Sequence, residues 1–418
     1  MLSIDYIRNN KEKVEQDAIN KNRPFDINRL LDLDEARRKA MTSAQELRQR
    51  RNELAKAGNN DSAREEGKQL KEQLKQAEEH LDAIDKEYNQ LMLHVPNVVL
   101  DEVPVGKDES GNKEIKTWGT IPQFDFTPRS HDELAAALNL IDMERGSKIG
   151  GFRGYFLLNE LALIQMALMQ FAFAKLAAKG YTPIIPPAIV KEFTLFGSAH
   201  FPWGRAEDVY KLHQDDDAFL AGTAEIPVTA FHSDEVLSEK DLPKKFVAMS
   251  PCYRREAGAY GKDTKGIMRV HEFWKIEQVI IAKNDINEAR ALHNELQQNT
   301  EEIFQDLELP YHVLLMCTGD MGEPQMLKYD TEVWIPSEHA YREVASNSIM
   351  GDFQARRLKM RYKKADGSIE YCYTLNDTAI ASTRPLIAIL ENNQQEDGSV
   401  KVPKVLQPLV GFDTIKPH

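Results

Sequence analysis

The sequence has few cysteines and no long uninterrupted hydrophobic run. Its three cysteines, Cys252, Cys317 and Cys372, lie far apart, which fits neither a disulfide framework nor a zinc site and indicates a reducing cytoplasm. The most apolar segment, residues 156–178, is interrupted by polar and charged side chains, which favours a core helix over a membrane span. Residues 1–10 lack the basic and apolar regions of a signal peptide. We therefore expect a soluble, cytoplasmic protein without a membrane partner.

The chain also lacks an excess of positive charge. It has 53 Lys and Arg against 66 Asp and Glu in 418 residues, a formal net charge of −13. This balance argues against general nucleic-acid coating but leaves room for a local basic surface. Hydrophobic residues make up 42% and charged residues 28%, as in soluble globular proteins, and the length allows two or three domains.

Between residues 27 and 95 there is no proline, and glycine occurs only at positions 58 and 67. In the second half, apolar residues alternate in steps of four and three, which is a heptad seam. These residues are Leu70, Leu74, Ala77, Leu81, Ile84, Tyr88, Leu91 and Val95. The first half keeps the same rhythm, interrupted by two arginines, at Leu30, Leu33, Ala40, Ala44, Leu47 and Leu54. With turn-forming residues at 58–62, the pattern predicts an antiparallel coiled-coil hairpin over about 27–95.

The charge of this predicted hairpin is opposite to that of the whole chain. Residues 36–75 carry eleven positive and six negative side chains, a net charge of +5. A solvated coiled-coil surface explains such a pattern, and so does an arm that binds phosphates. The reversal of sign favours the second interpretation without excluding the first.

The rest of the chain has a different character. Pro96 ends the hairpin, and residues 104–116, with Pro104, Gly106 and Gly111, have the composition of a linker. From residue 117 onward, long helical patterns mix with short β-rich stretches, as in an α+β domain. We therefore predict an N-terminal domain at 1–103, a linker at 104–116 and an α+β domain at 117–418.

Residues 245–256 and 266–280 both resemble β-strands, and a Gly-rich polar loop between them predicts an antiparallel pair. Alternation places Arg254 and Glu256 on one face of the first strand. One face of the second strand carries Arg269, His271, Phe273, Lys275 and Glu277. A solvated sheet face is one explanation of these charges. A buried face with Arg and Glu instead needs a charged ligand, and the pattern indicates an anion such as a nucleotide.

Three segments carry a family resemblance. Residues 250–277, SPCYRREAGAYGKDTKGIMRVHEFWKIE, resemble motif 2 of class II aminoacyl-tRNA synthetases in the form typical of seryl-tRNA synthetases. Residues 179–187, KGYTPIIPP, resemble motif 1, which forms the dimer interface in that family. Residues 374–394, TLNDTAIASTRPLIAILENNQ, resemble motif 3.

Two shorter segments and the N-terminal hairpin extend the resemblance over the whole chain. Residues 223–225, TAE, match the serine-site loop of seryl-tRNA synthetases. Residues 341–343, YRE, and 352–357, DFQARR, are similar to another family block. The basic hairpin is similar to the family's tRNA-binding arm. The resemblance implies a class II catalytic domain, built on an antiparallel β-sheet flanked by helices, after the coiled-coil hairpin.

The activity implied by the resemblance is that of a serine–tRNA ligase, which activates serine with ATP to seryl-adenylate and transfers it to tRNA(Ser). It implies Mg²⁺ bound through Glu343 and Ser346, no zinc, a homodimer, and no DNA partner. The implied catalytic residues are Arg254, Glu343 and Arg384. The implied ATP-binding residues are Arg254, Arg255, Glu256, Phe273, Glu343, Val344, Ala345, Ser346 and Arg384. The implied serine-binding residues are Thr223, Ala224, Glu225, Arg254, Glu277, Asn376 and Thr378. The implied tRNA-binding residues are Arg48, Arg51, Lys56, Arg64 and Lys68.

The sequence departs from the common bacterial pattern in places. Ala345 and Ile349 replace polar residues, and motif 3 has Thr378 at the serine position and Pro385 directly after its arginine. These changes bear on specificity and on the start of a helix rather than on the reaction class. Two alternatives remain: a homologue that loads an amino acid onto a carrier protein, which typically lacks the hairpin and uses zinc, and a non-catalytic RNA-binding paralogue, which should have lost the ATP residues.

Overall fold

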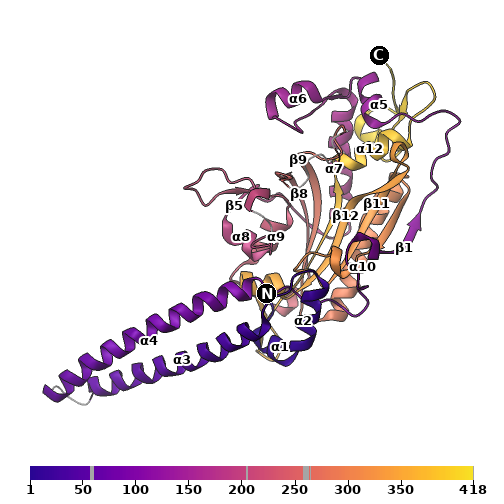
Figure 1. Cartoon of the computed structure of the whole chain (residues 1–418). Coiled ribbons are helices and arrows are strands. Elements are labelled where there is room, and N and C mark those ends of the chain that lie inside the picture. The colour runs from indigo at the N-terminus through magenta and orange to yellow at the C-terminus, as the bar shows by residue number, and fades with distance from the viewer. Residues whose placement is uncertain (57–60, 204–205, 258–262, 264, 418) are drawn as a thin grey trace. The chain divides into compact units, whose positions relative to one another are not determined.

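The computed structural model describes residues 1–56, 61–203, 206–257, 263 and 265–417. The chain divides into two compact units, Met1–Val98 and Val99–His418. We call them the N-terminal and the C-terminal unit and describe each by itself (Figure 1).

The N-terminal unit is helical. Its helices are α1 (Ile4–Asn9), α2 (Lys11–Asn20), α3 (Ile27–Lys56) and α4 (Asp61–Leu93). Residues 58–60 of the predicted turn lie outside the described residues. Ion pairs between α3 and α4 join Arg29 to Glu87 and Arg50 to Glu66, so residue numbers rise along one helix as they fall along the other. The predicted antiparallel hairpin is therefore confirmed.

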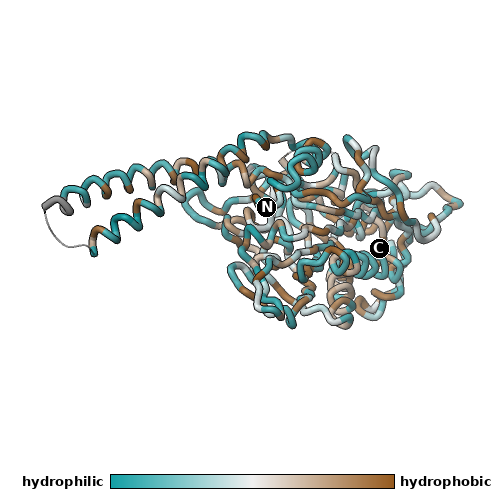
Figure 2. Tube along the Cα trace, turned by 90° about the horizontal axis from the view of Figure 1, so that it is seen from below, coloured by the Kyte–Doolittle hydropathy of each residue, from teal (hydrophilic) through white to brown (hydrophobic). Residues whose placement is uncertain are grey.

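The heptad seam lies between the two long helices. Leu30 and Leu33 of α3 and Leu70 and Leu74 of α4 are buried, while the outward positions are mostly exposed. In Figure 2 both helices are mostly hydrophilic, with hydrophobic residues at intervals. Arg37, which interrupts the seam, is accommodated because its guanidinium pairs with Asp85 at 2.5 Å and lies over the ring of Tyr88 at 5.1 Å.

The C-terminal unit is built on an eight-stranded sheet with the order β1-β10-β11-β12-β15-β9-β8-β4. The strands are β1 (Lys113–Trp118), β4 (Thr182–Ile184), β8 (Lys244–Tyr253), β9 (Glu272–Ala282), β10 (Tyr311–Leu315), β11 (Leu327–Ile335), β12 (Ala340–Gly351) and β15 (Tyr373–Ala381). Seven of them pair antiparallel, as predicted, but β4 pairs parallel with β8, which makes the sheet mixed.

Helices cover the two faces of the sheet unequally. Three long helices pack on one face around the main apolar core, namely α7 (Asn159–Ala178), α10 (Ile286–Asp306) and α12 (Thr383–Asn392). The short helices α9 (Glu225–Thr229) and α11 (Phe353–Leu358) pack on the other face around a smaller core. This second face is therefore covered only in part by helices, and the candidate site lies there.

The remaining elements are short. The helices are α5 (His131–Ala137), α6 (Met143–Gly150), α8 (Glu192–Gly197) and α13 (Gln407–Val410). The strands are β2 (Ile141–Asp142), β3 (Phe156–Leu157), β5 (Ile189–Val190), β6 (Phe219–Leu220), β7 (Val236–Ser238), β13 (Arg361–Lys363), β14 (Ile369–Tyr371), β16 (Val400–Lys401) and β17 (Thr414–Ile415).

Helix α7 contains the most apolar segment of the chain. By length and composition alone it could cross a membrane. In the fold, Leu161, Ile164, Leu168 and Leu176 of this helix are fully buried in the main core. It therefore serves as a core helix, as its interrupted hydrophobic pattern predicted.

Two expectations about strands were wrong in extent. Residues 113–116, assigned to the linker, belong to β1, which pairs with β10 at the edge of the sheet. The strand predicted at 245–256 ends earlier, at Tyr253. The strand predicted at 266–280 begins later, at Glu272. Glu256 and Gly266 have φ angles of +53° and +49°, a left-handed conformation that an extended strand does not contain.

Candidate functional site

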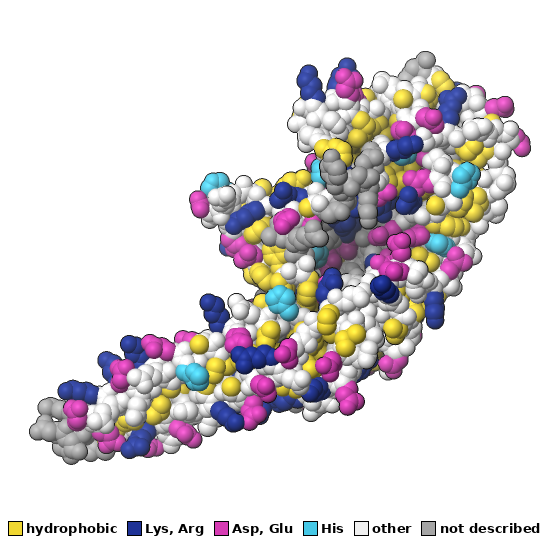
Figure 3. Space-filling model, viewed as in Figure 1, with side chains coloured by type: hydrophobic (Ala, Val, Ile, Leu, Met, Phe, Trp, Pro, Cys, Tyr) yellow, Lys and Arg dark blue, Asp and Glu magenta, His cyan; other side chains and the backbone are white. Residues whose placement is uncertain are grey.

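A cleft opens on the less covered face of the sheet, where β8, β9, β12 and β15 meet the start of α12. Figure 3 shows a hollow of the C-terminal unit bordered by basic and acidic side chains. The predicted site residues that line the cleft are Arg254, Glu256, Phe273, Glu343, Val344, Ala345, Thr378 and Arg384. Segments that resemble motifs 2 and 3 thus meet at one place, although more than a hundred residues separate the first of these residues from the last.

Arg254 follows the last residue of β8, and local bonds fix its position. Its backbone N–H donates to His271 O at 2.8 Å. Its guanidinium donates to Gly222 O at 3.2 Å and lies over the ring of Phe273 at 5.2 Å. The guanidinium is otherwise exposed to the cleft, so it can receive an anion.

Glu256 lies beside Arg254 at the mouth of the cleft. Its carboxylate accepts from Arg269 at 2.7 Å, and Arg269 also pairs with Asp263 at 3.1 Å. Arg269 therefore bonds to both acids. The carboxylate of Glu256 can still accept hydrogen bonds from other donors, because the bond from Arg269 uses only part of its acceptor capacity.

Arg384 connects three parts of the site. It stands in the first turn of α12, and its guanidinium donates to Glu343 O at 2.6 Å and to Met268 O at 3.4 Å. Pro385 follows within the same first turn, where the missing N–H breaks no helical bond, so the helix keeps its start at Thr383. The guanidinium is held by carbonyl groups rather than by a carboxylate, which leaves its charge uncompensated by these contacts.

A buried polar cluster, formed by Thr223, Lys275, Glu277 and Thr378, continues the cleft into the protein; we call it the polar cluster. Lys275 forms an ion pair with Glu277 and donates to Thr223 Oγ1 at 2.7 Å and Thr378 Oγ1 at 3.3 Å. Thr378 in turn donates to Glu277 at 3.2 Å. Burial raises the pKa of Glu277, and the ammonium of Lys275 opposes that rise.

Glu225 lies next to this polar cluster on the TAE segment. Burial raises the pKa of its carboxyl. The side chain of Gln354 donates to Glu225 Oε1 at 2.8 Å. The two acids of the site thus have different partners: Glu277 faces an ammonium and Glu225 a neutral amide.

The oxygen atoms of Glu343 and Ser346 suit a hard cation. Both residues lie on β12, Glu343 is exposed to the cleft, and Ser346 stands opposite the buried Asp330 of β11. Burial raises the pKa of Asp330 to about 7, although Lys328 pairs with its carboxylate at 2.8 Å. Among the described residues, no group of three or more His, Cys, Asp or Glu is arranged to hold a metal ion. Mg²⁺ commonly takes one or two protein oxygens and completes its shell with phosphates and water, which agrees with this sparse donor set.

Some predicted residues lie away from the cleft. Arg255 points toward the ring of Tyr210 at 5.9 Å, and its N–H donates to Asp208 O. Ala224 is fully buried in the smaller core. Asn376 is buried on β15 and is not part of the cleft lining.

The predicted tRNA-binding residues all belong to the hairpin of the N-terminal unit. Arg51 and Lys56 are exposed, and Lys68 is exposed with Glu65 at 3.7 Å. Arg48 pairs with Glu78 at 2.7 Å. The side chain of Arg64 lies outside the described residues. Figure 3 shows basic and acidic side chains side by side along this hairpin, so part of its positive charge is compensated locally.

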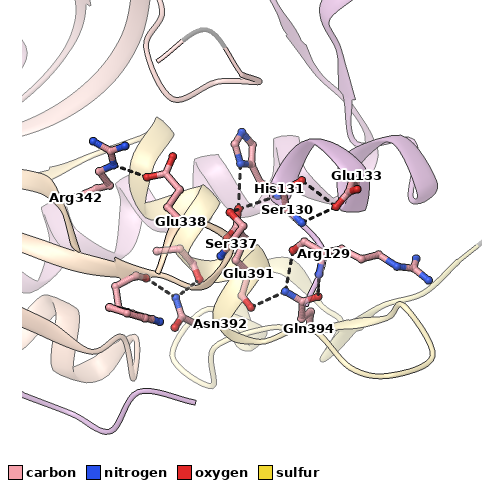
Figure 4. A network of polar contacts seen from close by, with 12 residues as sticks. Arg129, Ser130, His131, Glu133, Ser337, Glu338, Arg342, Glu391, Asn392 and Gln394 are labelled. Carbon is pink, nitrogen blue, oxygen red and sulfur yellow. Dashed lines mark hydrogen bonds and ion pairs between the residues drawn. The ribbon is translucent and has the colours of Figure 1, made fainter. Parts of the chain in front are cut away.

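A second polar network lies at the C-terminal end of α12 (Figure 4). Glu391, near the end of α12, accepts from the N–H and the Nδ1 of His131 at 2.8 and 3.1 Å and from Ser337 N–H and Oγ at 2.9 and 3.0 Å. A Cβ added to Gly266 would lie 2.1 Å from His131 Nε2. The network therefore fixes the C-terminal end of α12, the helix whose first turn carries Arg384, and Gly266 passes close to the ring of His131.

Lys275 is the residue that the sequence analysis missed as a site residue. The alternating pattern placed it on the charged face of the second strand but gave it no role. The signal in the sequence was its position between Phe273 and Glu277 on one face of the strand. Because that face is buried, Lys275 becomes the internal counter-ion of Glu277.

Comparison with known proteins agrees with this arrangement. Residues 210–393 match the tRNA synthetase class II core domain (G, H, P, S and T), and residues 1–99 match the seryl-tRNA synthetase N-terminal domain. The chain is 42% identical to the serine–tRNA ligase of Deinococcus radiodurans over 417 residues, covering 98% of each chain. The structure of seryl-tRNA synthetase from Pyrococcus horikoshii complexed with ATP matches with a TM-score of 0.93 at 37% identity over 100% of both chains. That of the cytoplasmic serine–tRNA ligase from Naegleria fowleri in complex with AMP matches with a TM-score of 0.88 at 31% identity, covering 99% of this chain and 97% of that one. This chain therefore belongs to the seryl-tRNA synthetase family.

Proposed function

We propose that this chain is a serine–tRNA ligase that forms seryl-adenylate from serine and ATP and transfers the seryl group to tRNA(Ser). The observation that carries the proposal is the meeting, at one cleft, of two guanidiniums that no carboxylate compensates, a phenyl ring and an adjoining buried polar cluster. Arg254 and Arg384 supply the positive charge, and Phe273 the stacking surface.

The first step joins two anions, so neutralisation of charge is the main task of the site. A carboxylate oxygen of serine attacks the α-phosphorus of ATP, and the bond from that phosphorus to the bridging oxygen breaks to release pyrophosphate. Arg254 would hold the carboxylate and α-phosphate together, and Arg384 would stack on the adenine from the side opposite Phe273. Glu343 and Ser346 would hold a magnesium ion, which supplies further positive charge to the phosphates.

Adenine would stack on Phe273, with Glu256 close enough to accept from its amino group. Arg254 lies over this ring at 5.2 Å, so adenine would use the part of the ring that the guanidinium leaves uncovered. Val344 and Ala345, on β12, would close the adenine site with apolar surface.

Serine would bind over the polar cluster. The ammonium of Lys275 compensates the charge of Glu277. Glu277 could then accept a hydrogen bond from the serine hydroxyl, and Thr378 could donate one to it. Glu225, bonded to a neutral amide, keeps its charge for the serine ammonium. Alanine lacks the hydroxyl and would leave buried polar groups unpaired, which disfavours its activation.

In the second step a hydroxyl of the terminal ribose of tRNA attacks the seryl carbonyl, and AMP leaves with the electrons of the broken carbonyl–oxygen bond. We propose that the hairpin formed by α3 and α4 binds the tRNA through its exposed Arg51, Lys56 and Lys68. A carrier-protein ligase would typically lack this hairpin. Deleting residues 33–91 should spare adenylate formation and abolish most tRNA charging; unchanged charging would rule out the hairpin as the tRNA arm.

The proposed functional state is a cytoplasmic homodimer. Leu163 and Met166 of α7 and Ile185 of the motif 1 segment are 53%, 62% and 74% exposed, which is unusual for a core helix and its neighbouring segment. A second copy of the chain would cover this apolar surface.

ATP–pyrophosphate exchange with a panel of amino acids tests the proposed reaction. Serine should drive exchange, while alanine, glycine and threonine should drive it far more weakly. Exchange with alanine or glycine but not with serine would refute the assignment of the substrate.

A further inference from the structure

The segment DFQARR, residues 352–357, has entered the account so far only as the source of the amide that bonds to Glu225. It forms α11, which packs on the same face of the sheet as the polar cluster. Two of its polar side chains point into the protein: Gln354 is fully buried, and Arg357 donates to Phe196 O and Phe201 O at 2.9 Å each. The helix therefore holds the loop that follows α8 as well as part of the serine site.

Both N–H groups of the Gln354 amide and its oxygen have specific partners. Its Nε2 donates to Glu225 Oε1 at 2.8 Å and to Ser198 O at 2.9 Å. Its Oε1 accepts from Thr374 Oγ1 at 2.6 Å. A carboxylate and a carbonyl can only accept, so the NH₂ group must face them and the amide has a single orientation. This orientation fixes the position of the Glu225 carboxylate.

The group of Gln354 that contacts Glu225 is uncharged, whereas the other acid of the site, Glu277, contacts a charged group. Glu277 is compensated by Lys275, whereas Glu225 forms no ion pair within the described part of the chain. A hydrogen bond from an amide restrains a carboxylate without cancelling its charge. A lysine or arginine in the place of Gln354 would hold Glu225 as firmly but would neutralise it.

We propose that Gln354 is a positioning residue for serine recognition: it fixes the rotamer of Glu225 by one hydrogen bond and leaves the carboxylate charge for the substrate ammonium. This inference rests on the proposed function of the site. It assigns to the DFQARR segment a role in amino-acid binding rather than in ATP binding, since the bonds of Gln354 reach the TAE segment and not the cleft around Phe273.

A purely structural role makes a different prediction. If the buried amide only stabilises α11, its loss would lower the melting temperature and would not change the KM for serine differently from the KM for ATP. Loss of a positioning contact should raise the KM for serine and leave the KM for ATP nearly unchanged. The split between the two constants separates the alternatives.

The test compares Gln354→Met with the matched control Thr374→Val in ATP–pyrophosphate exchange by the full-length protein. Methionine keeps the length of glutamine and removes its hydrogen bonds. Because a hydrogen bond to a charged group is lost, the serine KM of Gln354→Met should rise roughly 10- to 100-fold, with the ATP KM within about threefold of wild type. Thr374→Val removes the third bond of the same amide without touching Glu225, so its serine KM should change by less than about threefold.

Each outcome decides the matter. Equal rises in the serine KM for both variants, or equal rises of serine and ATP KM in Gln354→Met, would overturn the positioning role. If Gln354→Met lacks the wild-type circular dichroism spectrum, Gln354→Asn replaces it, since asparagine keeps the amide but is one methylene too short to reach Glu225. Wild-type exchange without dependence on serine would refute the proposed function itself, whereas serine-dependent wild-type exchange with unchanged variants would refute this inference alone.

Discussion

The ion pair between Lys275 and Glu277 allows a strict test of how the polar cluster is stabilised. The two side chains are only 5% and 2% exposed, so solvent screens their interaction little. Lys275→Met keeps the length of the side chain but leaves the carboxylate of Glu277 buried without its cation. Removing one partner of a buried pair costs about 3–5 kcal/mol, a large share of the roughly 5–15 kcal/mol by which domains are stable.

The loss should depend on pH in a defined direction. Burial already raises the pKa of Glu277, and removal of Lys275 should raise it further. Between the unfolded pKa of about 4.3 and this higher folded value, the folded state binds more protons than the unfolded state. Stability of the variant therefore falls as the pH rises through this window. The deficit relative to wild type should be small near pH 5 and approach its full size near pH 8.

Urea unfolding followed by circular dichroism at pH 5, 6.5 and 8 measures this deficit. The matched control is the double variant Lys275→Met with Glu277→Leu, in which apolar side chains replace the whole pair. It should recover most of the stability, because well-packed apolar residues can replace a buried pair, yet it should not recover serine-dependent exchange. A single variant within about 1 kcal/mol of wild type at pH 8, or a double variant no more stable than the single one, would refute the reasoning.

Three further predictions concern other parts of the C-terminal unit. Arg254→Ala should lower kcat/KM for exchange by about 100-fold or more and leave the melting temperature unchanged, since the side chain is exposed; near-wild-type exchange would remove Arg254 from the mechanism. Gly266→Ala should lower the free energy of unfolding by roughly 1–3 kcal/mol in urea melts, because φ is +49° and the new Cβ meets His131; an unchanged midpoint would contradict this. Leu163→Asp combined with Met166→Asp should sediment as a monomer with a wild-type circular dichroism spectrum; a persistent dimer would exclude α7 from the interface.

The sequence predicts those features that depend on local periodicity. The α3–α4 hairpin follows from a heptad seam in which Leu30, Leu70 and Leu74 point inward, and helix periodicity needs no knowledge of distant residues. The cleft residues followed from the resemblance and from alternation along β9, where Phe273 and Glu277 do share a face.

Features that depend on partners far away in the sequence could not be predicted. The role of Lys275 arises from the register that brings β15 and the TAE segment beside β9, and no local pattern encodes that register. The ends of β8 and β9 depend on the left-handed residues Glu256 and Gly266, of which only glycine is a recognisable signal. Residues 113–116 resemble a linker because β1 is an edge strand that is almost wholly exposed and therefore lacks hydrophobic alternation.

The two outermost strands of the large sheet carry a further consequence. A sheet edge presents unpaired N–H and C=O groups that can recruit a strand from another molecule. Strand β1 carries Lys113 and Lys116 on either side of a bulge, and β4 is three residues long with Pro183 at its centre. Charge, irregular spacing and a missing donor each oppose such recruitment. Both edges of the sheet would thereby resist strand-to-strand association between copies of the chain.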